Sequence, residues 1–130
     1  YVIISMIISK TPLRLSLLGG VTDYREYFDK KNGAVLGTTI NHYNYITLNK
    51  LSPFFEYKLR VTYSKTELVN HVEEICHPSV RETLKYSNLL DYLDIHYFAD
   101  LPARTGLGLS SSFTIGLLKS CLEYGAQRIH

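Results

Sequence analysis

Residues 101–112, LPARTGLGLSSS, form a glycine- and serine-rich segment between two runs with different patterns. The run before it, Asp94 to Ala99, is short and apolar and predicts a strand, whereas Phe113 to Tyr124 has apolar residues at helical spacing. Gly106 and Gly108 lack a β-carbon, so the backbone can turn sharply and approach a ligand closely. A helix N-terminus offers unpaired N–H groups and the positive end of its dipole. The order strand, loop and helix therefore predicts an anion-binding site.

The spacing of this segment differs from the two commonest phosphate-binding loops. A Walker A loop has a lysine after its second glycine, and no lysine follows Gly108. A Rossmann fingerprint needs a third glycine where this chain has Ser111. Serine is also among the best N-cap residues, so an ordinary helix start after a loop remains an alternative. From the residues alone, phosphate binding and simple capping stay about equally open.

A family resemblance favours phosphate binding. Pro102, Gly106-Leu107-Gly108 and Ser110-Ser111 resemble the second signature of the GHMP kinases, a superfamily that includes galactokinase, homoserine kinase and mevalonate kinase. Leu109 stands where family members usually have serine, and the run Ala103 to Thr114 most resembles the heptose 7-phosphate kinase branch. The resemblance implies that this loop binds the phosphates of ATP and that Ser110 reaches the β-phosphate or its Mg²⁺. The implied phosphate-binding residues are Thr105, Gly106, Leu107, Gly108, Leu109, Ser110, Ser111 and Ser112.

The second informative stretch is Thr11 to Tyr24. Leu13, Leu15 and Leu17 alternate with other residues as in a half-buried strand, with Pro12 at its start. This alternation places Arg14 on the opposite face, and Asp23 follows just beyond the strand. A solvated arginine and an aspartate N-cap are the simplest interpretations of these two residues.

The same stretch resembles the first signature of the sugar-kinase members of the superfamily. The matching pattern is Pro12-x-Arg14-x-x-Leu17-x-Gly19-x-x-Thr22-Asp23-Tyr24. By this resemblance Arg14 lies near the transferring phosphoryl group and is the catalytic candidate, while Asp23, with Thr22, binds the sugar substrate. Galactokinases have Glu-His where this chain has Gly20-Val21, so those substrate contacts do not carry over. Glycine-rich residues at this position fit the heptose kinase branch better.

The remaining sequence predicts further strands and helices. Strands are expected at Tyr1–Ile8, Ala34–Ile40, Tyr43–Leu48 and Tyr57–Ser64, and helices at Arg25–Lys31, Thr66–Glu74 and Pro78–Tyr86. The tyrosines of the sheet are expected to pack in the core rather than to form a ligand wall. The chain of 130 residues is long enough for one compact domain.

The resemblance implies an α+β fold with ribosomal-S5-domain-2-like topology. We expect residues 1–130 to form the N-terminal, ATP-binding domain of a GHMP kinase. Family members continue into a C-terminal domain with a third glycine-rich signature, and the sugar kinases carry their catalytic aspartate downstream of the second signature. We therefore expect this chain to be a fragment that lacks the second domain and is inactive alone. The implied activity is ATP- and Mg²⁺-dependent phosphorylation of a sugar or sugar phosphate, in particular a heptose 7-phosphate.

Composition argues against several other classes of protein. A net charge of +2 without a cluster of basic residues does not indicate nucleic-acid binding. No segment is long and apolar enough to span a membrane, and the absence of a signal peptide favours a cytoplasmic protein. Two cysteines make no disulfide framework. Cys76 beside His77 and His71 matches no standard zinc spacing, and a buried thiol next to a surface histidine is the expected arrangement.

Two alternatives of other functional classes stay open. The chain could be a non-catalytic phosphate-binding or interaction module, since the loop alone does not require catalysis. It could also be an RNA-binding domain, because the S5-like topology occurs in ribosomal proteins. The mild charge and the lack of a basic and aromatic strand face argue against RNA.

Overall fold

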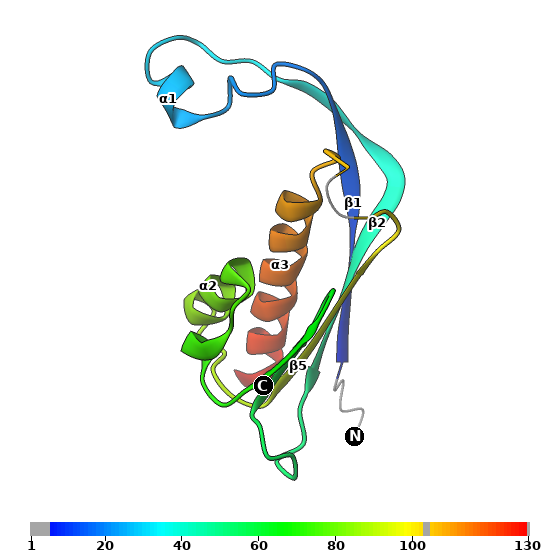
Figure 1. The fold of residues 1–130 in the computed structure, drawn as a ribbon, viewed down its shortest axis with the longest axis vertical. Helices are drawn as coiled ribbons and strands as arrows, with labels where there is room; N and C mark the ends of the chain where they lie inside the picture. The colour runs from blue at the N-terminus through cyan, green and yellow to red at the C-terminus, as the bar shows by residue number, and fades with distance from the viewer. Residues whose placement is uncertain (1–5, 103–104, 130) are drawn as a thin grey trace.

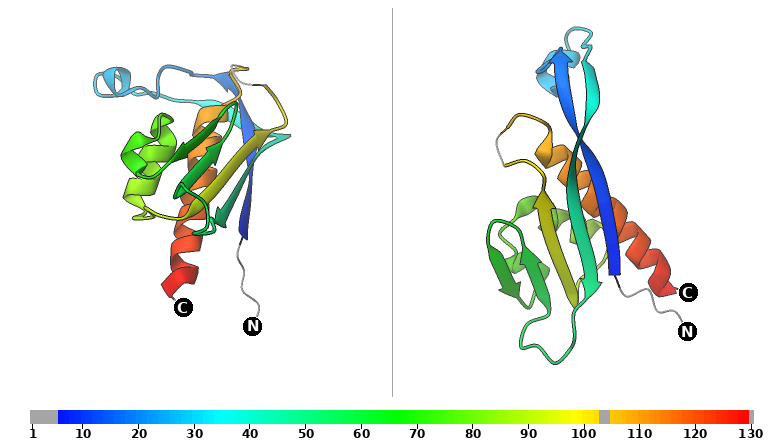
Figure 2. Two further views of the ribbon diagram at one scale, coloured as in Figure 1. Left: turned by 60° about the horizontal axis from the view of Figure 1, so that its bottom comes forward. Right: turned by 90° about the vertical axis from the view of Figure 1, so that its right-hand side faces the viewer.

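The computed structural model describes residues 6–102 and 105–129, which form one mixed sheet with helices on one side (Figures 1 and 2). Its strands are β1 (Met6–Leu18), β2 (Leu36–Lys50), β3 (Leu59–Thr62), β4 (Thr66–Val69) and β5 (Leu93–Ala99). The helices are α1 (Arg25–Phe28), the 3₁₀ helix η1 (Val72–Glu74), α2 (Pro78–Tyr86) and α3 (Leu109–Ile129). The sheet order is β1-β2-β5-β3-β4. All neighbouring pairs are antiparallel except β3 and β5, which confirms the expected α+β class.

The core lies between the sheet and the helices α2 and α3. On α3, Phe113, Leu117, Cys121 and Tyr124 recur at helical spacing and are buried. They meet residues that alternate along the strands, such as Ile46, Leu48 and Ile95, and residues of α2 such as Leu84. The strands therefore present one face to the helices and the other to solvent, as the period-2 patterns predict.

The strands β1 and β2 are longer than expected. They pair antiparallel from Met6↔Asn49 to Leu18↔Leu36, so the two predicted strands at 34–40 and 43–48 are one strand. The strand start predicted at Pro12 is also wrong, because Pro12 lies inside β1 next to a register shift. Proline is tolerated there since β1 is the edge strand. Tyr1–Ser5 of the first predicted strand lie outside the described residues, as do Ala103 and Arg104 of the loop.

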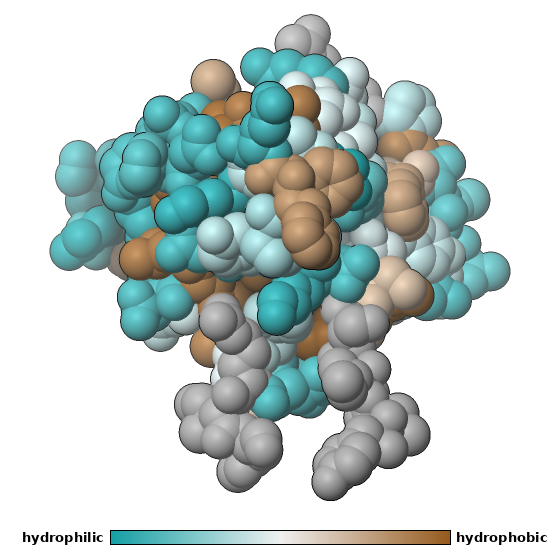
Figure 3. All heavy atoms as spheres, turned by 90° about the horizontal axis from the view of Figure 1, so that it is seen from below, coloured by the Kyte–Doolittle hydropathy of each residue, from teal (hydrophilic) through white to brown (hydrophobic). Residues whose placement is uncertain are grey.

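The far ends of β1 and β2 extend beyond the helices as an arm that carries α1 (Figure 1). Leu13 is fully buried, but Leu15 and Leu17 are 39% and 55% exposed, which corrects the predicted half-buried alternation. The helices α2 and α3 do not reach the arm, so its alternating side chains have no core to enter. Figure 3 shows that apolar side chains are also exposed among hydrophilic ones on the face seen from below.

The predicted helix at Thr66–Glu74 is wrong. Residues 66–69 form β4, which pairs with β3 through Leu59↔Val69, and only residues 72–74 are helical. Pairing with β3 decides the conformation here because a helix as short as the predicted one is only marginally stable without packing of its own. The prediction for α2 is confirmed at both ends, with Pro78 in its first turn. The helix α3 begins earlier and ends later than expected, whereas α1 is a single turn.

Candidate phosphate-binding site

The loop before α3 has the backbone geometry that its glycines allow. Gly106 and Gly108 have φ values of 73° and 71°, in the left-handed region that disfavours residues with a β-carbon. The N–H of Ser112 donates to the carbonyl oxygen of Gly108 at 3.0 Å, which starts the helical ladder. The N–H groups of Leu109 and Ser110 lie before this first bond, so they belong to the unpaired donors of the helix N-terminus.

The three serines at the start of α3 differ in what their hydroxyls bind. The Ser111 hydroxyl donates to the carbonyl oxygen of Gly108 at 3.0 Å. The Ser112 hydroxyl is buried and donates to the carbonyl oxygen of Pro12 at 3.1 Å, which ties the helix to β1. The Ser110 side chain is exposed and makes no hydrogen bond within the described residues. Of the three predicted hydroxyls, the structure leaves that of Ser110 free for a ligand.

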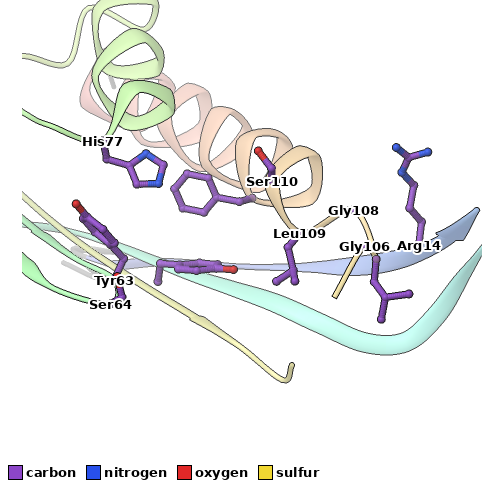
Figure 4. A pocket seen from close by; sticks show the side chains of 11 residues that line it. Arg14, Tyr63, Ser64, His77, Gly106, Gly108, Leu109 and Ser110 are labelled. Carbon is purple, nitrogen blue, oxygen red and sulfur yellow. The ribbon is translucent and has the colours of Figure 1, made fainter. Parts of the chain in front are cut away.

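Arg14 lies next to this loop, as Figure 4 shows. Its backbone N–H donates to the carbonyl oxygen of Leu107 at 3.1 Å, which joins β1 to the loop. Its side chain is exposed and forms no ion pair with any described residue. An unpaired guanidinium beside a helix N-terminus makes this corner of the molecule favourable for an anion.

A cavity of about 640 Å³ opens from the loop. Arg14 and residues 106–110 line one end (Figure 4). Tyr63, Ser64, His77, Tyr97 and Phe113 line the remainder. The rings make edge and tilted contacts, with Tyr97 and His77 respectively 4.8 and 5.1 Å from the Phe113 centroid. The cavity is thus polar and cationic at one end and aromatic at the other.

The sequence prediction missed the aromatic lining. The sheet tyrosines were expected in the core, and Tyr63 and Tyr97 pack against it while also facing the cavity. His77 was expected at the surface beside a buried thiol, but Cys76 is exposed and His77 is partly buried. Burial lowers the pKa of His77, so the imidazole is neutral at pH 7. Strand alternation would have found Tyr97, but nothing in the sequence links His77 to the loop.

Asn44 is a second residue that the sequence prediction missed. This side chain of β2 is fully buried. Its amide nitrogen donates to the carbonyl oxygen of Leu109 at 3.1 Å, and its amide oxygen accepts from the Tyr97 hydroxyl at 3.1 Å. A buried amide with both groups satisfied fixes its neighbours in place. Asn44 therefore holds the start of α3 and the cavity wall to the sheet.

The predicted sugar residues lie in a different place. Thr22 and Asp23 line a separate pocket of about 340 Å³ on the arm, together with Phe28, Gly33, Ala34 and Val35. The Thr22 hydroxyl accepts from the N–H of Ala34 at 3.2 Å and lies 2.7 Å from the carbonyl oxygen of Gly19, so it braces the arm. Asp23 is exposed. The structure thus brings Arg14 and the loop into one cavity and places Asp23 and Thr22 in another.

The described residues contain neither a cluster of side chains that could bind a metal ion nor a membrane-spanning helix. No three or more histidine, cysteine, aspartate or glutamate side chains gather there in a way that would hold a metal ion. No helix within residues 6–102 and 105–129 is long and apolar enough to cross a membrane.

No family model matches the chain. It is 31% identical over 128 residues to a D-glycero-alpha-D-manno-heptose 7-phosphate kinase of Campylobacter jejuni, a match that covers 89% of this chain and 37% of the relative. The chain therefore spans little more than a third of that kinase's length.

The solved structures give the same result for the fold. A D-glycero-D-manno-heptose 1-phosphate kinase from Bacteriodes thetaiotaomicron matches with a TM-score of 0.73 and 26% identity, covering 92% of this chain and 42% of that one. A putative sugar kinase from Campylobacter jejuni matches with a TM-score of 0.69 and 27% identity, and the match covers 92% of this chain and 41% of that one. The mevalonate kinase of Methanococcus jannaschii shares the fold, with a TM-score of 0.66 and 21% identity over 92% of this chain and 40% of that one. The expected resemblance to the GHMP kinases is therefore confirmed: the chain is similar in sequence to a heptose 7-phosphate kinase and has the fold of the N-terminal domains of GHMP kinases.

Proposed function

We propose that residues 1–130 form the N-terminal, ATP-binding domain of a GHMP-type kinase that phosphorylates a heptose 7-phosphate. The observation that carries this proposal is the meeting of three features around one cavity. These are a loop with two left-handed glycines, the free N-terminus and Ser110 hydroxyl of α3, and the unpaired Arg14. Each feature favours a phosphate group, and the kinase relatives supply the reaction class.

The loop would bind the phosphates of ATP through residues 105–112. The left-handed glycines turn successive N–H groups toward one side, an arrangement that suits phosphate oxygens. Mg²⁺ typically takes its ligands from substrate phosphates, water and one or two protein oxygens. The free Ser110 hydroxyl fits that limited role, and Mg²⁺ would neutralise charge on the phosphates there.

The aromatic end of the cavity suits the nucleobase. Its volume of about 640 Å³ lies in the usual range for small-molecule sites. Tyr63, Tyr97 and Phe113 offer apolar ring surface, and the neutral His77 adds ring nitrogens that can hydrogen-bond. A nucleotide with its phosphates at the loop would thus meet complementary chemistry at both ends.

Arg14 would act on the transferring phosphoryl group. A guanidinium near that group stabilises the charge on the oxygens in the transition state. Asp23 and Thr22, in the pocket on the arm, would hold the sugar hydroxyls, with Asp23 the exposed acceptor. Phosphoryl transfer needs donor and acceptor in line, so the sugar must extend from the arm toward Arg14.

Titration calorimetry with ATP, with and without Mg²⁺, tests the nucleotide site. We expect Mg²⁺ to raise ATP affinity, and Ser110→Ala to remove most of that gain. Ser111→Ala is the matched control, because its hydroxyl is bonded to Gly108 and its loss should leave the Mg²⁺ effect intact. Loss of the Mg²⁺ effect in both variants would contradict the role of Ser110.

Turnover separates a kinase from a non-catalytic phosphate-binding module, the second candidate. ADP release is measured with heptose phosphates and hexoses, on the chain itself and on a longer polypeptide in which a GHMP C-terminal domain follows it. Release that depends on a heptose 7-phosphate supports the kinase. ATP binding without turnover on any sugar in either polypeptide would favour the module.

A further inference from the structure

Glu67 is a buried carboxylate next to the cavity, although it does not line it. This side chain of β4 is 8% exposed. Its Oε1 atom accepts the hydroxyl of Tyr63 at 2.5 Å, and its Oε2 atom accepts the backbone N–H of Cys76 at 2.6 Å. One side chain therefore uses both oxygens to hold two separate segments of the chain.

These two segments carry neighbouring parts of the cavity's aromatic end. Tyr63 follows β3 in the turn toward β4, and the N–H of Tyr63 is bonded to the carbonyl oxygen of Lys65 at 2.9 Å. Cys76 immediately precedes His77, the residue before α2. The rings of Tyr63 and His77 meet edge to face with centroids 5.0 Å apart. Figure 4 shows both rings at the end of the cavity away from Arg14.

The electrostatics of this cluster favour a charged acceptor. Burial opposes the charge on Glu67, but the hydrogen bonds from Tyr63 and from the backbone of Cys76 and His77, together with the charge of Lys65, outweigh it and leave the pKa of this carboxyl below its ordinary value. Burial and the bond to Glu67 together raise the pKa of Tyr63 to about 12, so its hydroxyl remains a donor. Charge-assisted hydrogen bonds of this kind are about twice as strong as neutral ones.

The Nδ1 atom of His77 is buried and makes no hydrogen bond with any described residue, so no hydrogen bond at this atom fixes the ring. The ring is held instead by its packing between Tyr63 and Phe113. Its position therefore depends on the backbone that carries it and on the Tyr63 ring beside it. Glu67 holds both of these.

We infer that Glu67 is a positioning residue for the nucleobase: it holds Tyr63 and the segment that carries His77 at the separation that a base requires. This inference rests on the proposed binding of ATP in the cavity. Two acceptor atoms are needed, one for each segment. Glutamine has the same shape but no charge and only one acceptor oxygen, so if that oxygen keeps the Cys76 N–H, the amide can only donate a neutral hydrogen bond to the Tyr63 hydroxyl.

The test compares ATP with inorganic tripolyphosphate as ligands of the chain. Tripolyphosphate can occupy the loop but has no base, so its affinity reports on the loop alone. We expect Glu67→Gln to weaken ATP binding by about tenfold, the effect of one charge-assisted hydrogen bond, and to leave tripolyphosphate affinity within about twofold. Tyr63→Phe, which keeps the ring and removes one of the two bonds, should shift the ratio of the two affinities in the same direction.

Glu74→Gln is the matched control. The Glu74 carboxylate also accepts two backbone N–H groups, from Asn70 and His71, but at the exposed start of η1. It should leave the ratio of ATP to tripolyphosphate affinity unchanged.

Three outcomes would overturn the inference. The first is wild-type ATP affinity in folded Glu67→Gln and Tyr63→Phe proteins. The second is an equal loss of affinity for both ligands, which would give Glu67 a general role in the fold. The third is wild-type protein that binds neither ligand, which would reject the proposed function itself and is thereby distinguished from the other two.

Discussion

The side chain of Arg14 lies against the α-carbon of Gly108, so that a β-carbon at position 108 would come within 2.8 Å of the Arg14 Cγ atom and 3.0 Å of its Nε atom. Arg14 belongs to β1, and Gly108 is the last loop residue before α3. The arginine can lie this close to the loop because residue 108 has no side chain. The two sequence signatures thus meet in one contact.

Gly108→Ala should weaken ATP binding. The new β-carbon would displace Arg14, and the left-handed φ of 71° would be strained. We expect a loss of about tenfold in affinity, or ~1.4 kcal/mol, by titration calorimetry. Gly106→Ala is the control, because Gly106 has a similar φ of 73° but no atom of a described residue, apart from its chain neighbours, within 4 Å of its β-carbon position. Equal losses in the two variants would assign the effect to backbone strain and remove Arg14 from the explanation.

Arg14→Ala should lower kcat more than it raises KM for ATP. The guanidinium would act mainly on charge in the transition state, and loss of such a group typically costs about 10²-fold or more in kcat. The measurement is steady-state kinetics on a preparation with kinase turnover. Lys10→Ala removes another exposed cation of β1, one that lies over the Tyr43 ring, and should leave both parameters near wild type. A rise in KM alone would make Arg14 a ground-state contact to ATP.

Gly116→Ala should destabilise the fold. A β-carbon there would come within 2.6 Å of the Thr11 hydroxyl, because α3 packs closely on β1 at this point. Overpacking of this kind costs ~1–3 kcal/mol and should lower Tm. Gly125→Ala lies on the same helix and has no neighbour among the described residues within 4 Å of its β-carbon position, so it should instead stabilise by up to ~1 kcal/mol. Thermal unfolding followed by circular dichroism measures both, and shifts of the same sign would contradict the close packing.

Asn44→Ala should destabilise the protein and loosen the start of α3. It would remove the second donor to the Leu109 carbonyl oxygen and the acceptor of the Tyr97 hydroxyl, at a cost of ~1–3 kcal/mol. Amide hydrogen exchange should rise in residues 109–113 more than in α2. Tyr97→Phe removes only one of the two bonds and should have a smaller effect. Uniform exchange across both helices would indicate a general loss of stability.

Cys121 should be protected from thiol reagents, while Cys76 should react. Burial raises the pKa of Cys121 to about 12, so almost no thiolate forms at pH 8, and the side chain is fully buried. Cys76 is exposed. Mass spectrometry after iodoacetamide treatment at pH 8 should find one adduct on the folded chain and two after denaturation. Two adducts on the folded chain would show that the helix face around Cys121 opens.

Local patterns in the sequence were sufficient for several elements of this protein. Pro78 followed by a helical pattern located α2, alternating apolar residues located β3, and a short apolar run located β5, because these signals depend only on neighbours along the chain. The two signatures also identified the kinase resemblance, since glycine spacing and the following serines reflect backbone geometry close to a helix N-terminus.

Other features depended on contacts between distant segments. Residues 66–69 form a strand because β3 lies beside them, and Leu15 and Leu17 stay exposed because α2 and α3 do not reach the arm. Sequence could not show that Tyr63, His77 and Tyr97 face the phosphate loop, or that Thr22 and Asp23 lie in a separate pocket. The physical reason is the same in each case: burial and side-chain pairing are set by which elements pack together, and that packing is decided only when the whole chain folds.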